Sequence, residues 1–429
     1  MPSPITTYSQ RHLAALRHRN FRLLWLGLFV SFSGTFMQQA AILWHVSLLA
    51  PPGRKGLALG LVGLVRVVPI IVFSLVSGVA ADVFDRRKLL LITQVGGTLV
   101  AAALAGLAFS GVRSLWPIYV LAAIGSASSA FDAPARQSLV PKLVPKDDLP
   151  NAISLNTAMV QVAQVGGPAI GGAIIGVANV GWAYVFNALS FLFVIVALVM
   201  MRNVPATERG AGHAGDQMSF KAAREGLRFV FRAPMIRSTM LLDFFATFFA
   251  SAMALLPMFA QDVLHVGARG YGWLYAAPAA GACLGSLAMV RFVNNIERRG
   301  PVLIWAVVAY GMATIVFGFS TSFWLTLFCL ALSGATDAVS MVFRNLIRQL
   351  GTPDEMRGRM TGINMVFFMG GPQLGELEAG AVANWLGAPI SVIVGGIGCV
   401  IATVVVAGVT PELRHYRREI SPPPSFPLS

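Results

Sequence analysis

Long blocks of apolar residues, separated by short polar segments, run through almost the whole chain. A helix of roughly 20 apolar residues is long enough to cross the hydrocarbon core of a bilayer. Only helices and closed barrels satisfy their backbone hydrogen bonds in lipid, and unbroken apolar blocks lack the alternation of a barrel strand. The pattern therefore predicts an all-α integral membrane protein with about twelve transmembrane helices. The expected spans are 23–49, 57–81, 89–110, 115–135, 155–177, 180–201, 238–262, 270–292, 302–320, 323–343, 360–384 and 388–410.

The composition supports this prediction. Hydrophobic residues make up 56% of the 429 residues and charged residues only 12%, about half of what a soluble globular chain usually carries. The formal net charge of +14 would by itself suggest a nucleic-acid partner. If the N-terminus lies in the cytoplasm, however, most of the 32 Lys and Arg residues fall on the cytoplasmic side of the predicted spans. We therefore expect both termini in the cytoplasm and no nucleic-acid partner.

The longest polar segment falls in the middle of the chain and divides the predicted spans into two groups of six. We expect an N-terminal six-helix bundle over 1–201, a cytoplasmic linker over 202–237, a C-terminal six-helix bundle over 238–410 and a cytoplasmic tail over 411–429. Apolar residues recur at helical spacing within the linker, which favours a helix that ties the two bundles together.

The two halves carry matching residues. Arg136 and Arg344 stand 208 positions apart, and Asn156 and Asn364 keep the same offset. Two parallel six-helix repeats are the layout of one large class of transporters. A glycine–proline motif also occurs in both halves, in the fifth and the eleventh predicted spans. Its residues are Gly167, Pro168, Gly171 and Gly172 in the first half and Gly371, Pro372 and Gly375 in the second. Glycine allows close helix packing, which suits elements that rock against each other.

The loop between the second and third predicted spans contains Gly78, Asp82, Arg86 and Arg87. Gly78 lets another helix approach closely, and Asp82 can pair with Arg86 or face the positive N-terminus of a nearby helix. Such a gating loop would hold one conformation and release in another. An ordinary positively charged cytoplasmic loop with an acidic helix end fits the same spacing.

These residues resemble the loop signature of the major facilitator superfamily, G-x-x-x-D-x-x-G-R-R/K, with Asp85 in place of the second glycine. The segments 20–25, 132–136 and 151–154 resemble the efflux branch that contains the enterobactin exporter and macrolide-efflux proteins. The resemblance implies the two-bundle fold, a bacterial inner membrane, a monomer, and export of a drug-like or siderophore-like small molecule by alternating access and proton antiport. Many proton-coupled antiporters have an arginine in the middle of the fourth span, and this chain has none there.

Ionisable residues inside spans are costly and are functional candidates by default. Asp243, Glu376 and Glu378 are acidic residues in the seventh and eleventh predicted spans, and Arg66 lies in the second. A carboxyl group in an apolar environment exchanges a proton more readily near neutral pH than one in water. We therefore take Asp243 and Glu376 as the first candidates for proton coupling, with Arg66 as a partner. A buried ion pair that holds the helices in register is the alternative.

Two further groups are candidates. Asp132 with Arg136, and Asp337 with Arg344, are expected to form latches at the cytoplasmic ends of the fourth and tenth spans. Uncharged polar residues within spans either line a substrate cavity or bond neighbouring helices, which is their commoner use. They are Gln38, Gln39, Gln161, Gln164 and Asn187.

Three function classes remain open: an exporter, an importer or facilitator on the same fold, and a membrane receptor or scaffold that does not transport. An enzyme is not expected, because no phosphate-binding loop of the form G-x-x-x-x-G-K-[ST] occurs. No cofactor or metal site is expected either, since the three cysteines stand apart from one another and from histidines.

Overall fold

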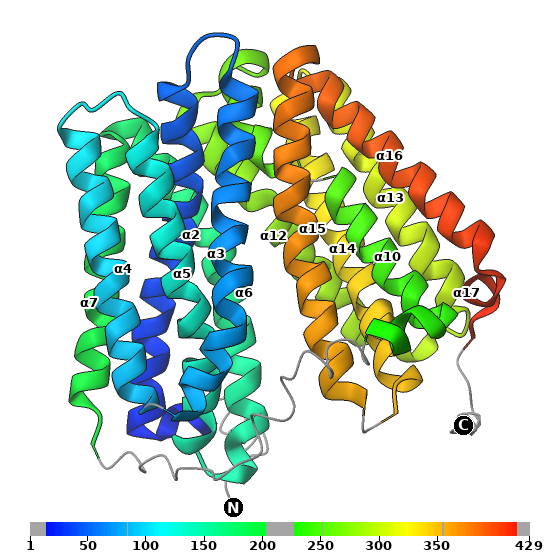
Figure 1. The fold of residues 1–429 in the computed structure, drawn as a ribbon, viewed down its shortest axis with the longest axis horizontal. Coiled ribbons are helices and arrows are strands. Elements are labelled where there is room, and N and C mark those ends of the chain that lie inside the picture. The colour runs from blue at the N-terminus through cyan, green and yellow to red at the C-terminus, as the bar shows by residue number, and fades with distance from the viewer. Residues whose placement is uncertain (1–13, 84, 203–226, 251, 354–355, 418–429) are drawn as a thin grey trace, which may run out of the picture. The chain divides into compact units, whose positions relative to one another are not determined.

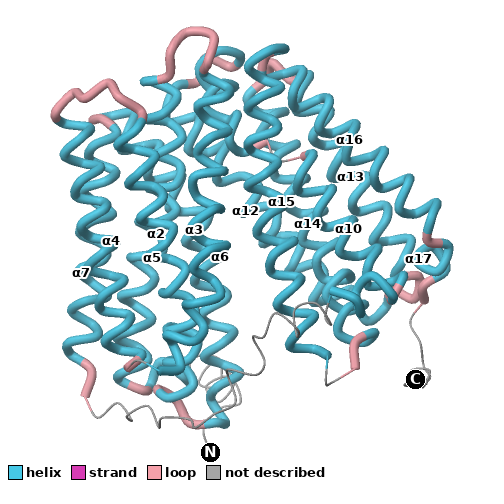
Figure 2. Tube along the Cα trace, in the orientation of Figure 1, coloured by secondary structure: helices cyan, strands magenta, loops and turns pink. Residues whose placement is uncertain are grey.

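The computed structural model describes residues 14–83, 85–202, 227–250, 252–353 and 356–417. Within the helices, the side chains of 74–83, 357–359, 361–362, 365–366 and 369 are not described. The described part of the chain consists of helices joined by loops and contains no strand, as Figure 2 shows. The all-α prediction is confirmed. Most of the predicted linker lies outside the described residues.

Long helices follow the predicted apolar blocks (Figure 1). The first half contains α2 (Arg19–Leu49), α3 (Lys55–Val83), α4 (Arg86–Phe109), α5 (Trp116–Leu139), α6 (Leu149–Val177) and α7 (Val180–Met200). The second half contains α10 (Pro234–Phe249), α12 (Gly267–Phe292), α13 (Arg299–Phe319), α14 (Phe323–Gly351), α15 (Arg357–Leu386) and α16 (Ala388–Val409).

Shorter elements join them: 3-10 turns at Ala14–Arg17, Val140–Lys142, Lys146–Asp148, Met253–Leu255 and Val293–Asn295, the helix α11 (Leu256–Met258), a π-helix at Phe259–Val263 and α17 (Pro411–His415).

Ten helical stretches of the described chain are long and apolar enough to cross a membrane. Helices α5 and α15 are not among them, so the predicted count of twelve stays a prediction. The expected break between the fifth and sixth spans is confirmed, because α6 ends at Val177 and α7 begins at Val180 after the capping residue Asn179. The side chain of Asn179 accepts a hydrogen bond of 2.9 Å from the amide of Gly181, which satisfies one of the free donors at the start of α7.

By their internal contacts the residues fall into two compact units. The first comprises Met1–Ala50, Val65–Ala214 and Val266–Ala276, and the second comprises Pro51–Leu64, Gly215–His265 and Ala277–Ser429. In the first unit the helices pack in the order α5, α4, α7, α2, α6. In the second they pack in the order α14, α13, α16, α10, α15. Counted along each half, these are the same helices in the same order, which is what a parallel repeat requires.

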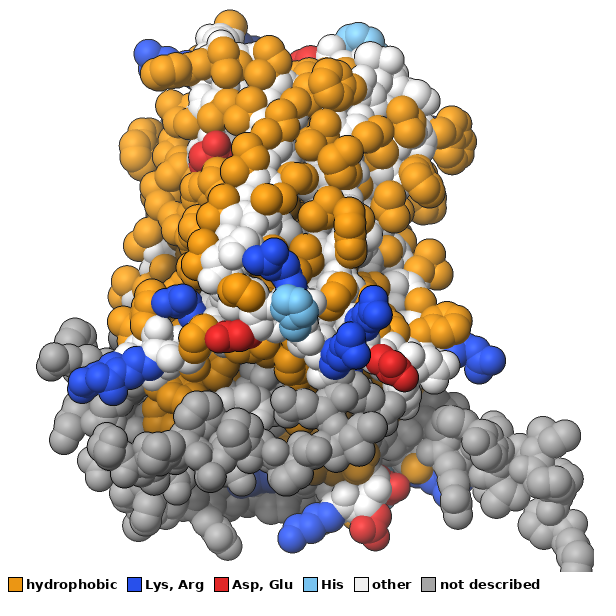
Figure 3. Space-filling view, turned by 90° about the vertical axis from the view of Figure 1, so that its right-hand side faces the viewer, with side chains coloured by type: hydrophobic (Ala, Val, Ile, Leu, Met, Phe, Trp, Pro, Cys, Tyr) orange, Lys and Arg blue, Asp and Glu red, His pale blue; other side chains and the backbone are white. Residues whose placement is uncertain are grey.

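The helix surfaces are strongly apolar. Figure 3 shows hydrophobic side chains over most of one face, with Lys and Arg gathered mainly toward its lower end. Large apolar side chains that are mostly exposed lie on the outward faces of several helices, where water would disfavour them and lipid would not. Examples are Leu99, Val199, Trp305, Phe319 and Trp385.

Polar contacts at the start of α2 tie it to later parts of the first unit. The Asn20 side chain donates a 2.7 Å hydrogen bond to the carbonyl of Arg202. The indole of Trp25 donates one of 3.2 Å to the carbonyl of Leu155 in α6. The His18 ring lies 2.7 Å from the carboxylate of Asp148. The efflux-branch segment 20–25 is therefore an anchoring element of the first unit.

Candidate functional site

A buried group of charges joins α10 and α14 in the second unit. Asp243 of α10 is 2% exposed, and its Oδ1 lies 3.1 Å from Nη1 of Arg344 in α14. Nη2 of the same arginine donates a 2.9 Å hydrogen bond to Oδ1 of Asp337, two helical turns earlier on α14. Arg344 is only 1% exposed, so it lies almost dry between two carboxylates. Such an arrangement is retained only if each charge is compensated, because desolvating an unpaired ion costs several kcal/mol.

Arg348 is the fourth member of this group. Its Nη1 lies 3.5 Å from Oδ2 of Asp243, and it also donates hydrogen bonds to the side-chain oxygens of Asn345 and Asn364. The group formed by Asp243, Asp337, Arg344 and Arg348, which we call the charge cluster, thus contains two negative and two positive side chains. We did not single out Arg348 from the sequence. Its position four residues after Arg344, on the same helix face, was the available signal.

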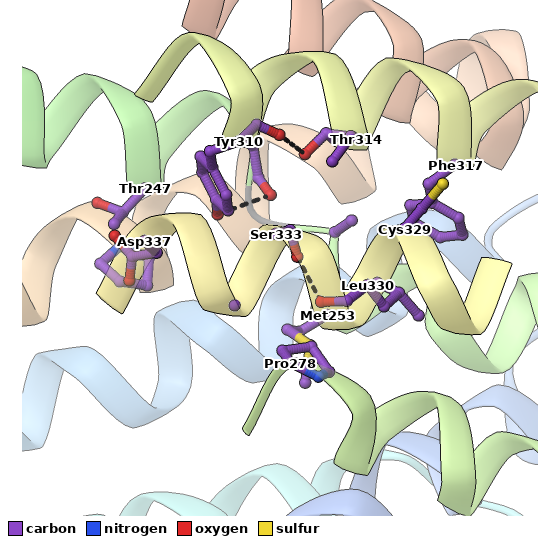
Figure 4. Close-up of a pocket in the computed structure, with 15 residues that line it drawn as sticks. Thr247, Met253, Pro278, Tyr310, Thr314, Phe317, Cys329, Leu330, Ser333 and Asp337 are labelled. Atoms are coloured by element: carbon purple, nitrogen blue, oxygen red, sulfur yellow. Dashed lines mark hydrogen bonds between the residues drawn. The ribbon is translucent and has the colours of Figure 1, made fainter. Parts of the chain in front are cut away.

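A cavity of about 220 Å³ adjoins the charge cluster within the second unit. Helices α10, α13 and α14 provide much of its wall, with proline residues from α12 and α15. Figure 4 shows Thr247 and Asp337 at one end and Phe317 and Cys329 at the other. Its polar lining side chains are Thr247, Tyr310, Thr314, Ser333 and Asp337. Asp337, whose side chain is 38% exposed, is the member of the charge cluster that lines this space.

The first unit has a smaller counterpart at Asp132 and Arg136 of α5. Oδ1 of Asp132 accepts hydrogen bonds of 2.7 Å from Gln94 and 3.3 Å from Thr93, both on α4. Its Oδ2 lies 3.5 Å from Nε of Arg136. The guanidinium of Arg136 lies 4.6 Å from the ring centre of Phe32 in α2, which is a cation–π contact. The predicted pairs are therefore present in both halves, while their role as latches stays a prediction.

The predicted gating loop is described in part. Helix α3 includes Gly78 and Asp82, but their side chains lie outside the described set. Asp85, which replaces a glycine of the signature, caps α4 by accepting hydrogen bonds from the amides of Arg87 and Lys88. Arg86 donates to the carbonyl of Ser138 at the end of α5, and Arg87 donates to that of Val199 at the end of α7. These arginines bind free carbonyls at helix C-termini, where cations are favoured.

The glycine–proline motifs mark close helix contacts in both units. A Cβ atom on Gly167 would lie 3.1 Å from Cβ of Phe36, so α6 packs directly on α2. A Cβ atom on Gly172 would lie 2.6 Å from Cα of Gly272 at the start of α12. In the second unit, Gly371 and Gly375 of α15 are packed in the same way on α10. The predicted use of the motif in helix packing agrees with these contacts.

Glu376 lies where α15 meets the first turns of α3, within the second unit. It is 7% exposed, and a Cβ atom on Gly63 would lie 2.8 Å from its Oε2. A Cβ atom on Gly56 would lie 2.6 Å from the carbonyl of Gly380. At the same end of α3, Nζ of Lys55 lies 2.9 Å from the carboxylate of Asp262. The glycines thus let α3 and α15 approach closely, and the ion pair joins the start of α3 to the π-helix Phe259–Val263.

The other predicted residues occupy less distinctive places. Glu378 is half-buried on α15 and Arg66 is half-buried on α3. Asn187 of α7 donates a 2.8 Å hydrogen bond to Gln38 of α2, so this pair bonds helix to helix. Three other predicted cavity residues are half-buried on α2 and α6. They are Gln39, Gln161 and Gln164. Within the described residues no group of three His, Cys, Asp or Glu side chains could hold a metal ion.

Comparison with known proteins gives a consistent result. The sequence profile of a family described as transmembrane secretion effector matches residues 10–424. The enterobactin exporter EntS of Citrobacter koseri is 26% identical over 420 residues, with 96% of both chains covered. The protein of the same name from Escherichia coli K12 is also 26% identical, over 410 residues and 94% of both chains.

Solved structures of transporters share the fold. One is a bacterial homologue of the human lysosomal transporter Spinster in an inward-facing, unoccupied conformation, with a TM-score of 0.72, 15% identity, and coverage of 94% of this chain and 99% of that one. Another is a bacterial homologue of the iron transporter ferroportin, inward-facing, with a TM-score of 0.66, 16% identity, and coverage of 93% and 99%. At these identities the likeness establishes the fold alone.

Proposed function

This chain belongs to the transmembrane secretion effector family of the major facilitator superfamily, and we propose that it exports its substrate by alternating access coupled to proton entry. The family is described as secretion effectors and the relatives are named exporters, so the protein is an exporter and not an enzyme. Export against a gradient needs an energy source, and the chain contains no phosphate-binding loop for ATP. Exchange against protons supplies the energy without one.

The proposed substrate is a small siderophore-like or drug-like molecule. Relatives that match almost the whole chain are named enterobactin exporters, which favours a siderophore-like compound. We place the protein in a bacterial inner membrane as a monomer with both termini in the cytoplasm, because this orientation puts most Lys and Arg residues on the inner side.

Alternating access requires helix contacts that form in one state and separate in another. The contacts of α3 with α15 and of α6 with the start of α12 suit this role, because glycines let their backbones meet with few interlocking side chains. The ion pair between Lys55 and Asp262 would then be made and broken with them. On this proposal the pair Asp132 and Arg136, with the loop residues Arg86 and Arg87, serves as a latch at the opposite ends of the helices.

One observation carries the proton-coupling proposal: carboxylates are buried inside the apolar spans, at Asp243 in the charge cluster and at Glu376 beside α3. Burying ionised carboxylates in spanning helices is costly, so their presence indicates function. A group that gains or loses a proton there changes the balance of charge between packed helices. That change links proton binding to helix movement.

The test uses purified protein in liposomes that contain a pH-sensitive dye. Iron-free enterobactin is added first, and lipophilic drugs are then added one at a time. We expect substrate-dependent proton movement that is lost in Asp243→Asn or in Glu376→Gln, with Glu412→Gln as a matched control on the short helix α17. Equilibration of labelled enterobactin without proton movement would contradict antiport and leave a facilitator. Binding without any flux would leave a receptor.

A further inference from the structure

The cavity beside the charge cluster is too small for a drug-sized exported molecule. Pockets for drug-sized ligands usually enclose about 300–1,000 Å³. The cavity measures about 220 Å³, and hydroxyl groups of Thr247, Tyr310, Thr314 and Ser333 reach its wall. Most of the wall is apolar, and these side chains together with Asp337 are the polar partners it offers to a water molecule. Asp337 is the charged side chain that borders this space.

Asp337 differs from Asp243 in its access to this space. Its side chain is 38% exposed and lines the cavity, while that of Asp243 is 2% exposed and faces two arginines. A proton can reach the carboxylate of Asp337 without opening the contact between α10 and α14. Reaching Asp243 would require that opening.

Arg344 is placed to respond to a change at Asp337. In the described residues its one directed hydrogen bond goes from Nη2 to Asp337. Its Nη1 lies 3.1 Å from Oδ1 of Asp243, yet neither atom makes a hydrogen bond of suitable geometry with any described residue. Arg344 thus forms ion pairs with both carboxylates but makes a well-aligned hydrogen bond only with Asp337. If that one loses its charge, the guanidinium has a second acceptor within reach.

The other titratable groups near Asp337 come from each neighbouring helix. Arg344 and Arg348 belong to α14 itself, Asp243 to α10, Tyr310 to α13 and Cys399 to α16. The hydroxyl of Tyr310 donates to the carbonyl of Ala250 at 3.3 Å. With two carboxylates and two guanidiniums the charge cluster is neutral overall, and one added proton makes it positive.

We propose that Asp337 takes up the coupling proton and that Arg344 is the positioning residue that passes this change to Asp243. The proposal rests on the proton-coupled export proposed above and refines its site. A hydrated proton transfers to the Asp337 carboxylate: one O–H bond of the hydronium ion breaks, one forms on the carboxyl group, and a water molecule is left. Arg344 then turns its guanidinium toward Asp243, which draws α14 onto α10. Loss of the proton to water restores the bond to Asp337. Asp243 acts in this scheme as the fixed counter-charge.

The first test does not depend on a substrate. Dicyclohexylcarbodiimide adds to protonated carboxyl groups in apolar surroundings, and the adduct is located by peptide mass spectrometry of the full-length protein in micelles. We expect label on the peptide that contains Asp337, with labelling lost as the pH is raised. Asp337→Asn should abolish it, and Thr336→Ala, the neighbouring control, should retain it. Label that persists in Asp337→Asn, or that is found on Asp243 instead, would overturn the assignment.

The second test measures coupling in liposomes with enterobactin as the probe. Asp337→Asn should lose substrate-driven proton movement while still exchanging labelled for unlabelled enterobactin, and Asp337→Glu should restore part of the proton movement. Wild-type proton movement in Asp337→Asn would contradict the assignment. If wild-type protein moves no protons at all, the proposed antiport fails, whereas the labelling experiment still decides whether Asp337 binds a proton. A melting curve for each variant separates loss of function from loss of folding.

Discussion

Arg136 and Arg344 occupy the same place in the fourth helix of each half, yet their surroundings differ. Arg136 lies against the ring of Phe32 and pairs with one carboxylate, which neutral side chains from α4 also bind. Arg344 lies between two carboxylates, and a second arginine, Arg348, joins them. The first site is 16% exposed at the arginine and the second 1%. The two halves thus share the arrangement of helices but differ in the charged residues around this arginine.

This difference separates a site that holds helices together from one that can sense a proton. In the first half, Thr93, Gln94 and Arg136 all compensate Asp132, so its charge has several local partners. In the second half, charges compensate charges in an almost dry environment, where their interactions are weakly screened. A change of one charge there must alter the packing of α10 on α14.

The largest expected effect comes from removing the central carboxylate. Asp243→Asn leaves two buried arginines without their shared partner and should destabilise the protein by about 3–5 kcal/mol. Asp132→Asn, the matched change in the first half, should cost only about 1–3 kcal/mol. Denaturant unfolding in micelles, followed by tryptophan fluorescence, measures both. Equal losses would mean that the two sites do not differ in the way described.

An effect of intermediate size on the free energy of unfolding is expected at the matching asparagines, Asn156 and Asn364. Asn364 accepts a hydrogen bond from Arg348, so Asn364→Ala should cost about 1.5–3 kcal/mol. The residue 208 positions earlier than Arg348 is Val140, and the buried Oδ1 of Asn156 has no hydrogen-bond partner among the described residues. Asn156→Ala should therefore be neutral or slightly stabilising. The same unfolding measurement applies, and a clear loss of stability in Asn156→Ala would refute the reasoning.

The smallest effect is expected at the aromatic contact of the first half. Phe32→Leu keeps an apolar side chain but removes the ring beneath Arg136, which should cost about 0.5–1 kcal/mol of cation–π energy. A double-mutant cycle with Arg136→Gln isolates this interaction from the lost packing. A coupling energy near zero would show that the ring only fills space.

The sequence was sufficient for most of the fold. Apolar blocks located the long helices. The loop signature and the segments 20–25, 132–136 and 151–154 correctly indicated the superfamily and its efflux branch. Helix ends were less predictable. Helix α14 runs to Gly351, eight residues beyond the predicted end, because Arg344 and Arg348 continue it on a buried face. In the sequence, two arginines resemble the end of a span. Their burial depends on compensation by Asp337 on the same helix and by Asp243, about a hundred residues earlier.

The sequence predicted most of the residues that belong to the candidate site, but not which of them contact each other. The sequence indicated Asp243 as a coupling candidate, and it indicated Asp337 with Arg344 as a latch. The structure brings them into one cluster, and it places Asp337 near the middle of α14 rather than at the end of a span. Which carboxylate borders the cavity depends on how α13 and α14 pack, and no local pattern in the sequence encodes that.

The anchoring contacts of α2 also constrain how the protein is made. Asn20 bonds to Arg202, 182 residues later, and Trp25 bonds to Leu155, 130 residues later. At about 5–20 residues per second, a ribosome needs roughly 10–40 s to travel from the first partner to the second. During that interval α2 is already synthesised while the groups that fix its first turn do not yet exist. The contact between Asn20 and Arg202 therefore forms only after all six helices of the first half have been synthesised, and a chain released earlier would lack it.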